Sequence, residues 1–176
     1  MSGPNVARAV AATLSELGVN HAFGVLGSGN FEVTSALVGL GARWVPARHE
    51  EGACAMADAF ARVSGRVPAC SVHQGPGFTN TLTALTEAAK SRTPMLVLAG
   101  DSPAATVSSN FRIDQAAIAA AVGAGFERLH GPGTAVADTA RAHRRALVER
   151  RPIVLSMPID VQAAPVPADG AQLWAA

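Results

Sequence analysis

Hydrophobic residues along the chain follow two patterns, short apolar runs and longer stretches with helical periodicity. In the stretch 5–18, the buried-type positions recur every three or four residues and Gly18 follows as a helix stop. The run "PMLVLAG" at 94–100 is continuously apolar between Pro94 and Gly100, as expected of a strand that is covered on both faces. The chain therefore alternates between amphipathic helices and buried strands.

The same patterns predict six strands and six longer helices. The strands are expected at 21–26, 42–47, 69–73, 94–100, 125–129 and 152–157. The helices are expected at 5–18, 31–38, 50–64, 79–92, from about 114, and at 134–150. Gly65 ends the third helix, and Thr79 or Asn80 is the predicted cap of the fourth, after a "QGPGF" loop at 74–78.

This alternation predicts an α/β fold, a doubly wound and mainly parallel six-stranded sheet with helices on both faces. One domain is expected over residues 1–162, and the Ala- and Pro-rich segment 163–176 reads as a tail or docking arm. Ligands of such sheets bind at the carboxyl ends of the strands. Four loops should meet at that edge: "GSGN", the segment that starts with Glu50, "HQGPG" and "GDSP".

Composition and charge narrow the classes of function. The chain has 176 residues, 49% of them hydrophobic, and a net charge of +1. It has no basic stripe and no Tyr, so no nucleic-acid partner is expected. It also has no apolar run of about eighteen residues and no signal-peptide pattern. We therefore expect a soluble cytoplasmic protein without a membrane partner, and Cys54 and Cys70 are too few for a disulfide framework.

Candidate chemistry begins with "RHEEGACAMADAFAR" at 48–62, where two carboxylates open a predicted helix. They either stabilise the positive end of the helix dipole or one of them is catalytic. No phosphate-binding loop and no nucleophile elbow occurs in the sequence. The spacing of His49, Glu50, His73 and Asp101 matches no metal-ligand pattern, so no metal site is predicted. Taken alone, His73 is as compatible with a structural hydrogen bond as with catalysis.

Four stretches together carry a family resemblance. They are "GVNHAFGVLGSGN", "RHEEGACAMADAFARVSGRV", "HQGPGFTNTLTALTEAAKSRTPMLVLAGD" and "RRPIVLSMPIDVQ". In order and spacing they resemble the pyrimidine-binding (PYR) domain of thiamine-diphosphate enzymes, in the acetolactate synthase and benzoylformate decarboxylase branch. The resemblance covers about 6–161, and it implies thiamine diphosphate as the cofactor.

The resemblance gives the opening carboxylate a role. In that family, the Glu after the second strand contacts N1′ of the aminopyrimidine, and Glu50 is the matching residue. This contact favours the imino form of the cofactor, whose 4′-nitrogen removes the proton from the thiazolium C2. Glu51 lies about 100° away on the helix and is expected to be solvated or paired. The small residues Ala53, Ala57 and Ala61 are expected to let this helix pack against a second subunit.

The resemblance also implies roles for other residues at the strand ends. Leu26 and Gly27 match a loop against the pyrimidine ring, and Asn80 matches a position near it. His73 matches a histidine that handles protons and also contacts the cofactor. The substrate-facing positions are Ser28, Gly29 and Phe111. Leu26 stands where many relatives have Pro, and Phe111 where the synthases tend to have Gln, which leaves acetolactate synthesis itself in question.

A second family domain is missing from this sequence. It binds the diphosphate through Mg²⁺ and is marked by Gly-Asp-Gly followed by Asn, a motif that does not occur here. We therefore expect a larger partner subunit that holds Mg²⁺ and shares the cofactor, in a heterotetramer or larger assembly with PYR–PYR contacts. The expected function is the PYR subunit of a split 2-oxo-acid decarboxylase or carboligase.

Several alternatives stay open at the level of the sequence. The chain could be a piece of a longer enzyme, or a non-catalytic PYR-like scaffold or regulatory subunit. An unrelated doubly wound nucleotide-binding domain is disfavoured by the absence of a phosphate loop. The sequence does not distinguish decarboxylation from ligation, and it does not identify the small 2-oxo acid.

Overall fold

The computed structural model describes residues 5–103 and 105–166. Its centre is a six-stranded sheet in the order β2-β1-β3-β4-β6-β5, and every neighbouring pair is parallel. The strands are β1 (His21–Gly24), β2 (Arg43–Pro46), β3 (Ala69–Val72), β4 (Met95–Asp101), β5 (Gly125–Arg128) and β6 (Pro152–Pro158). The predicted fold class is confirmed, and all six predicted strands are present.

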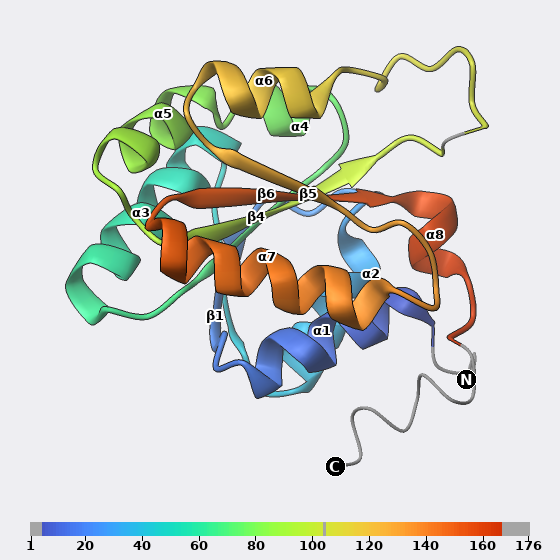
Figure 1. Cartoon of the computed structure of the whole chain (residues 1–176), viewed down its shortest axis with the longest axis horizontal. Coiled ribbons are helices and arrows are strands. Elements are labelled where there is room, and N and C mark those ends of the chain that lie inside the picture. Colours follow the sequence, from blue (N-terminus) through green and yellow to red (C-terminus); the bar gives the residue numbers. More distant parts are fainter. Residues whose placement is uncertain (1–4, 104, 167–176) are drawn as a thin grey trace.

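Helices cover both faces of this sheet (Figure 1). One face carries α1 (Val6–Glu16), α2 (Phe31–Gly39) and α7 (Ala135–Glu149). The other face carries α3 (Glu50–Ser64), α4 (Pro76–Thr79), α5 (Leu82–Lys90) and α6 (Gln115–Ala121). A short α8 (Ile159–Ala163) follows β6. None of the described helices is long and apolar enough to cross a membrane.

The two hydrophobic cores follow from the alternation of side chains along the central strands. In β4, Leu96 and Leu98 pack toward α1 and α7, whereas Met95 and Val97 pack toward α3 and α5. All seven residues of β4 are buried. A strand covered on both faces needs apolar residues at every position, which explains the unbroken apolar run in its sequence.

The order of the strands places a topological switch between β1 and β3. From β1 the chain moves outward to β2 through α2, and from β3 it moves the other way to β4 through α4 and α5. The helices of the two crossovers lie on opposite faces of the sheet. The loops after β1 and β3 therefore leave the carboxyl edge in opposite directions, at the usual ligand position of such folds.

The structure corrects several local predictions. The "QGPGF" segment is not a plain loop, because α4 forms there, and the cap of α5 is Thr81 rather than Thr79 or Asn80. The predicted tail at 163–176 begins within α8, and Pro165 forms an antiparallel bridge with Asn5. The remainder of that segment, 167–176, lies outside the described residues.

The alanine face of α3 is also not the subunit contact that the sequence suggested. Ala53 and Ala57 are fully buried, and Ala61 is 5% exposed, in the core that α3 forms with the sheet and α5. Small residues here let α3 approach its own sheet closely. Any contact between PYR domains must use other surfaces.

Candidate functional site

The loop after β1 is held in place by one buried side chain, Asn30. Its carbonyl oxygen accepts a bond from the backbone N–H of Gly27 (2.8 Å), and its amide donates to the Val25 carbonyl (3.1 Å). The same amide donates to the hydroxyl of Ser71 on β3 (3.0 Å). Asn30 is fully buried, so these bonds form away from water and fix the loop to the neighbouring strand. Asn30 was not among the site residues predicted from the sequence, although it ends the "GSGN" stretch.

His73 follows β3 and lies directly against this loop. Its Nδ1 accepts a hydrogen bond from the backbone N–H of Gly29 (3.1 Å). An accepting Nδ1 carries no proton, so the neutral ring has its proton on Nε2. A Cβ at Gly27 would lie 2.7 Å from Cγ of His73, and one at Gly29 would lie 2.9 Å from Nδ1. Only glycine at these two positions lets the imidazole pack on the loop.

Phe111 covers His73 from the long segment between β4 and α6. The two ring centroids are 5.0 Å apart in an edge-on arrangement. The backbone of Phe111 contacts Gly75, where a Cβ would lie 2.8 Å from its carbonyl oxygen. Phe111 remains 39% exposed, so it presents an apolar surface beside the His73 ring while restricting the movement of that ring.

Glu50 is the first residue of α3, which begins after the β2 strand. His49 caps the helix, because its Nδ1 accepts a bond from the backbone N–H of Glu51 (3.2 Å). The half-buried Glu50 carboxylate accepts a bond from the side-chain amide of Asn80 through Oε2 (2.9 Å). Its Oε1 accepts no side-chain or backbone hydrogen bond from the described residues. One oxygen of this carboxylate is therefore free for an outside ligand.

Gly77 on α4 lies between the two predicted catalytic residues. A Cβ at this position would lie 3.1 Å from Cβ of His73 and 3.5 Å from Oε1 of Glu50. The short helix α4 thus brings the Glu50–Asn80 pair and His73 to one place at the carboxyl edge. Glu51, in contrast, is exposed and makes no side-chain hydrogen bond among the described residues.

The remaining predicted residues belong to the loop after β1. Leu26 is 47% exposed and Ser28 is exposed, while Gly29 is buried. The carbonyl oxygen of Gly29 accepts a bond from the amide of Gln162 on α8 (2.9 Å), which also donates to the Met157 carbonyl (2.8 Å). These two hydrogen bonds could not be predicted from the sequence, because no local pattern relates residues so far apart in the chain.

The carboxyl edge continues past β4 into a hollow of about 430 Å³ between β4, β5 and the start of α6. Asp101 lies at its base, where Arg128 and the Ser156 hydroxyl donate to its Oδ2. The amide of Gln115 donates to the Gly100 carbonyl (2.7 Å). Asp101 is thus committed to internal contacts with neighbouring strands.

Two buried cysteines lie near Glu50. Cys54 is one helical turn after Glu50, and Cys70 is on β3. The hydrogen bond that the Cys70 thiol donates to Cys54, together with burial and the nearby charge of Glu50, raises the pKa of the Cys70 thiol well above its usual range. Cys70 is therefore a packing residue rather than a nucleophile.

Comparison with known proteins decides the family. Residues 4–119 match the family described as "Thiamine pyrophosphate enzyme, N-terminal TPP binding domain". The chain belongs to this family.

Relatives of this TPP-binding domain include several enzymes. A Pseudomonas aeruginosa protein named "Probable 2-ketoarginine decarboxylase" is 37% identical over 168 residues, which are 92% of this chain and 30% of the relative. Sulfoacetaldehyde acetyltransferase of Castellaniella defragrans is 32% identical over 84% of this chain and 25% of its own length. Human 2-hydroxyacyl-CoA lyase 2 is 43% identical over 91 residues. The chain thus spans about a third or less of the curated relatives it matches.

Solved structures show the same fold. A thiamine diphosphate-dependent 4-hydroxybenzoylformate decarboxylase of Rhodococcus jostii superposes with a TM-score of 0.85 at 24% identity. The match covers 98% of this chain and 33% of that protein. A thiamin diphosphate-dependent enzyme of Mycobacterium smegmatis, described as putative, superposes with a TM-score of 0.83.

The residues of this TPP-binding domain fit the pyrimidine end of the family's cofactor. A pyrimidine ring nitrogen can form a hydrogen bond with a carboxyl group, and Oε1 of Glu50 would be available for such a bond because Asn80 contacts only Oε2. The other oxygen is already held by Asn80, which fixes the orientation of the carboxylate. Among the described residues, no cluster of three or more His, Cys, Asp or Glu side chains could hold a metal ion.

Proposed function

We propose that this chain supplies the pyrimidine-binding half of a thiamine-diphosphate enzyme that decarboxylates a small 2-oxo acid or ligates the resulting fragment. The observation that carries the proposal is the Glu50–Asn80 pair (2.9 Å) beside His73 at the switch of the sheet. The relatives named as decarboxylase, acetyltransferase and lyase support this class of chemistry without selecting one reaction.

Glu50 is the proposed activating residue. When bound, thiamine diphosphate would supply a nucleophilic thiazolium carbon for chemistry at the carbonyl group of a 2-oxo acid. Glu50 would hold N1′ of the pyrimidine through Oε1 and exchange a proton with it. Asn80 would keep the carboxylate aligned. The half-buried position limits competition from water, so this hydrogen bond would be stronger than one on the surface.

His73 is the proposed proton donor toward the substrate. Its Nδ1 accepts from Gly29, so Nε2–H is the group left to act on a ligand. The edge-on packing of Phe111 restricts rotation of the ring and places an apolar surface beside it. Ser28 and Leu26 are exposed on the adjacent loop and would face the substrate and the pyrimidine, respectively.

The diphosphate end of the cofactor requires another protein region, which we propose to be a separate larger subunit that binds Mg²⁺. Support comes from the match to a domain that forms only 30% or less of its curated relatives. A highly charged diphosphate needs oxygen ligands and a divalent cation, and residues 5–103 and 105–166 offer no such cluster.

Calorimetry tests this proposal. The purified chain should bind thiamine diphosphate weakly and without dependence on Mg²⁺. Co-expression with a polypeptide that carries the Gly-Asp-Gly and Asn motif should give a complex with tight, Mg²⁺-dependent binding and turnover of 2-oxo acids. Tight, Mg²⁺-dependent binding by the chain alone would contradict the need for a second subunit.

A further inference from the structure

The amino edge of the sheet, opposite the Glu50 site, carries a second cavity of about 390 Å³. It lies where α3, α5 and α7 end and where β4 begins. Arginine dominates its lining, and no carboxylate side chain contributes to it. The lining residues are Ala61, Arg62, Gly65, Arg66, Ser91, Arg92, Thr93, Pro94 and Arg150.

Three of the four arginines have no carboxylate partner. Arg62 is matched by Asp58 on its own helix and by Glu87 on α5. Arg66, Arg92 and Arg150 form no ion pair with any carboxylate of residues 5–103 and 105–166. Three arginines on and after α7 differ from them, since Arg141, Arg145 and Arg151 all pair with glutamates. The cavity therefore has a local excess of positive charge.

The backbone gives an independent observation. Three helix ends at this edge have a residue in the left-handed region: Gly65 (φ 69°), Arg92 (φ 56°) and Arg150 (φ 51°). Glycine is the usual residue at such a position, because a Cβ strains it. Two of the three ends carry arginine instead, so a residue with a Cβ occupies a position that glycine would adopt without strain.

Stabilisation of the helix end by positive charge can account for Arg150, because the last turn of α7 has no basic residue, but it does not account for Arg92. The last turns of α3 and α5 already contain Arg62 and Lys90, which meet that need with ordinary helical backbone. Arg92 and Arg150 lie just beyond the last residues of α5 and α7, where they add positive charge at the cavity. Thr93 lines the same cavity, is 2% exposed, and its hydroxyl finds no hydrogen-bond partner within the described residues.

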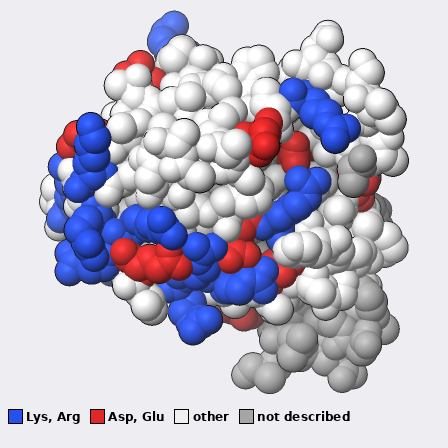
Figure 2. Space-filling model, turned by 45° about the horizontal axis from the view of Figure 1, so that its top comes forward, with Lys and Arg blue, Asp and Glu red and all other residues white. Residues whose placement is uncertain are grey.

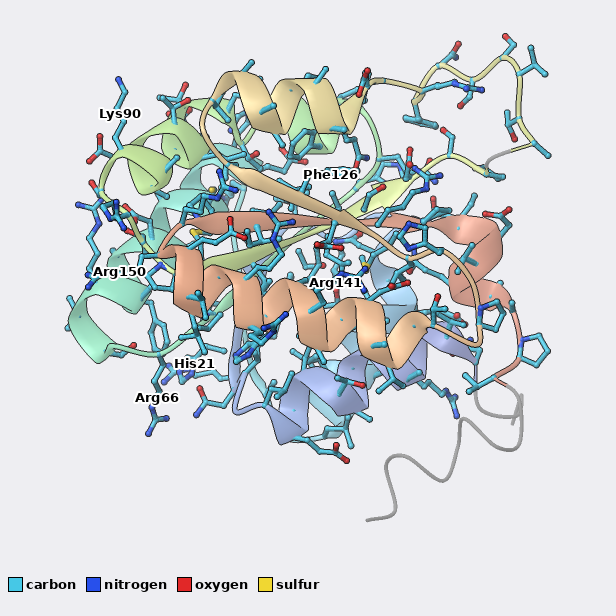
Figure 3. The ribbon with its side chains drawn as sticks, viewed as in Figure 1. His21, Arg66, Lys90, Phe126, Arg141 and Arg150 are labelled. Carbon is cyan, nitrogen blue, oxygen red and sulfur yellow. The ribbon has the colours of Figure 1, made fainter. Side chains whose placement is uncertain are left out.

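The figures show this arrangement at one end of the molecule. Basic side chains gather at the left of the surface in Figure 2, the end at which α7 finishes in Figure 1. In Figure 3, Arg150 and Arg66 lie at this same end, whereas Arg141 lies toward the middle of α7. The carboxyl ends of β4 and β6 point to the other end of the molecule.

We propose that this cavity is a binding site for a phosphate-bearing small molecule, with Arg66, Arg92 and Arg150 as its cationic ligands. Guanidinium groups bind phosphate oxygens in pairs of charge-assisted hydrogen bonds, and three of them suit a diphosphate better than a single carboxylate. Free pyrophosphate and a nucleoside diphosphate share this chemistry. The site is remote from Glu50 and does not depend on the proposed function.

Calorimetric titration of the chain with pyrophosphate and, separately, with ADP tests the site. The informative variants are Arg92→Gly and Arg150→Gly, because glycine suits the left-handed backbone and the variants should melt at or above the wild-type temperature. Each should weaken pyrophosphate binding about tenfold or more, the usual effect of one lost charge-assisted contact. Arg144→Ala, an exposed arginine on α7 outside the cavity, is the matched control and should bind like wild type.

The two ligands separate the possible sources. Equal affinities would assign the site to the polyphosphate group itself, and tighter binding of ADP would assign it to a nucleotide. The absence of saturable binding to either ligand would overturn the proposal. Glycine variants that bind pyrophosphate as tightly as wild type would also overturn it. A chain that binds a polyglutamate peptide but not pyrophosphate would overturn it too, because that result would indicate a protein-binding surface.

Discussion

Two adjacent glutamates open α3, and their surroundings differ sharply. Glu50 is half-buried, is held by Asn80, and has one free oxygen near His73. Glu51 is exposed and contributes only its charge to the helix end. A helix-end carboxylate on the surface stabilises a helix by about 0.3–1 kcal/mol. The pair is thus a natural comparison between a positioned carboxylate and a solvated one.

Substitution of Glu50 should slow cofactor activation, whereas substitution of Glu51 should leave it unchanged. In the complex with the proposed partner, Glu50→Gln should slow hydrogen–deuterium exchange at C2 of thiamine diphosphate by about 10²–10⁴-fold, because an amide cannot exchange a proton with N1′. NMR after acid quench measures the rate. Glu51→Gln should exchange like wild type. If C2 exchange is slow in Glu51→Gln and fast in Glu50→Gln, then Glu51 and not Glu50 is the activating residue.

His73 should affect turnover more than cofactor binding. His73→Ala removes the proposed Nε2–H donor and should lower kcat about 10²–10⁴-fold, the usual contribution of a general acid or base. The affinity for thiamine diphosphate should change little, and a binding titration beside the kinetic assay checks this. If the variant keeps a near-normal kcat, His73 only supports the loop that contains Gly27 and Gly29.

At the scale of elements, sequence patterns were most reliable where an element is long and its core contacts are numerous. The ends of α3 agree with prediction at Glu50 and Gly65, because capping and left-handed backbone are local properties. The single turn α4 was missed because Pro and Gly at 75–77 are typical of loops. It places Gly77 against both His73 and Glu50, which are contacts between distant segments that no local pattern encodes.

The alanine face of α3 gives a prediction about stability. Ala57→Leu adds three carbon atoms to a fully buried position and should destabilise the chain by about 1–3 kcal/mol. The melting temperature should fall by about 2–4 °C for each kcal/mol. Ala55→Leu, on the exposed side of the same helix, should stay within about 0.5 kcal/mol of wild type. Equal melting temperatures for the two variants would mean that this face is not part of the core.

For the whole molecule, the sequence was sufficient for the sheet and for the edge at which ligands bind. The neighbouring strands β4 and β6 are buried along their whole length and largely apolar, and parallel connections through helices leave few arrangements. It was insufficient for contacts between distant segments, such as Gln162 with Gly29 or Phe111 with His73. Those contacts depend on side-chain shape at the meeting point of three loops, which no local pattern encodes.

The buried histidine of α7 makes stability depend on pH. Burial lowers the pKa of His143, so the folded chain keeps it neutral while the unfolded chain binds a proton near pH 6.5. Unfolding therefore takes up a proton, and stability should fall as the pH drops below about 6.5. Melting temperatures between neutral and mildly acid pH measure this loss of stability. The melting temperature of His143→Gln should fall less than that of wild type over the same pH interval. An equal loss in the variant would assign the effect to other groups.

The first and last described segments of the chain meet. The backbone N–H of Val6 donates to the carbonyl of Ala164 (3.0 Å), next to the Asn5–Pro165 bridge. The polypeptide path is therefore almost a closed ring. A circular permutant that joins residues 5 and 165 by a short linker and opens the chain at Gly131–Gly133, between β5 and α7, would keep every strand pairing. This domain can thus be reconnected within a fusion protein without disturbing either edge of its sheet.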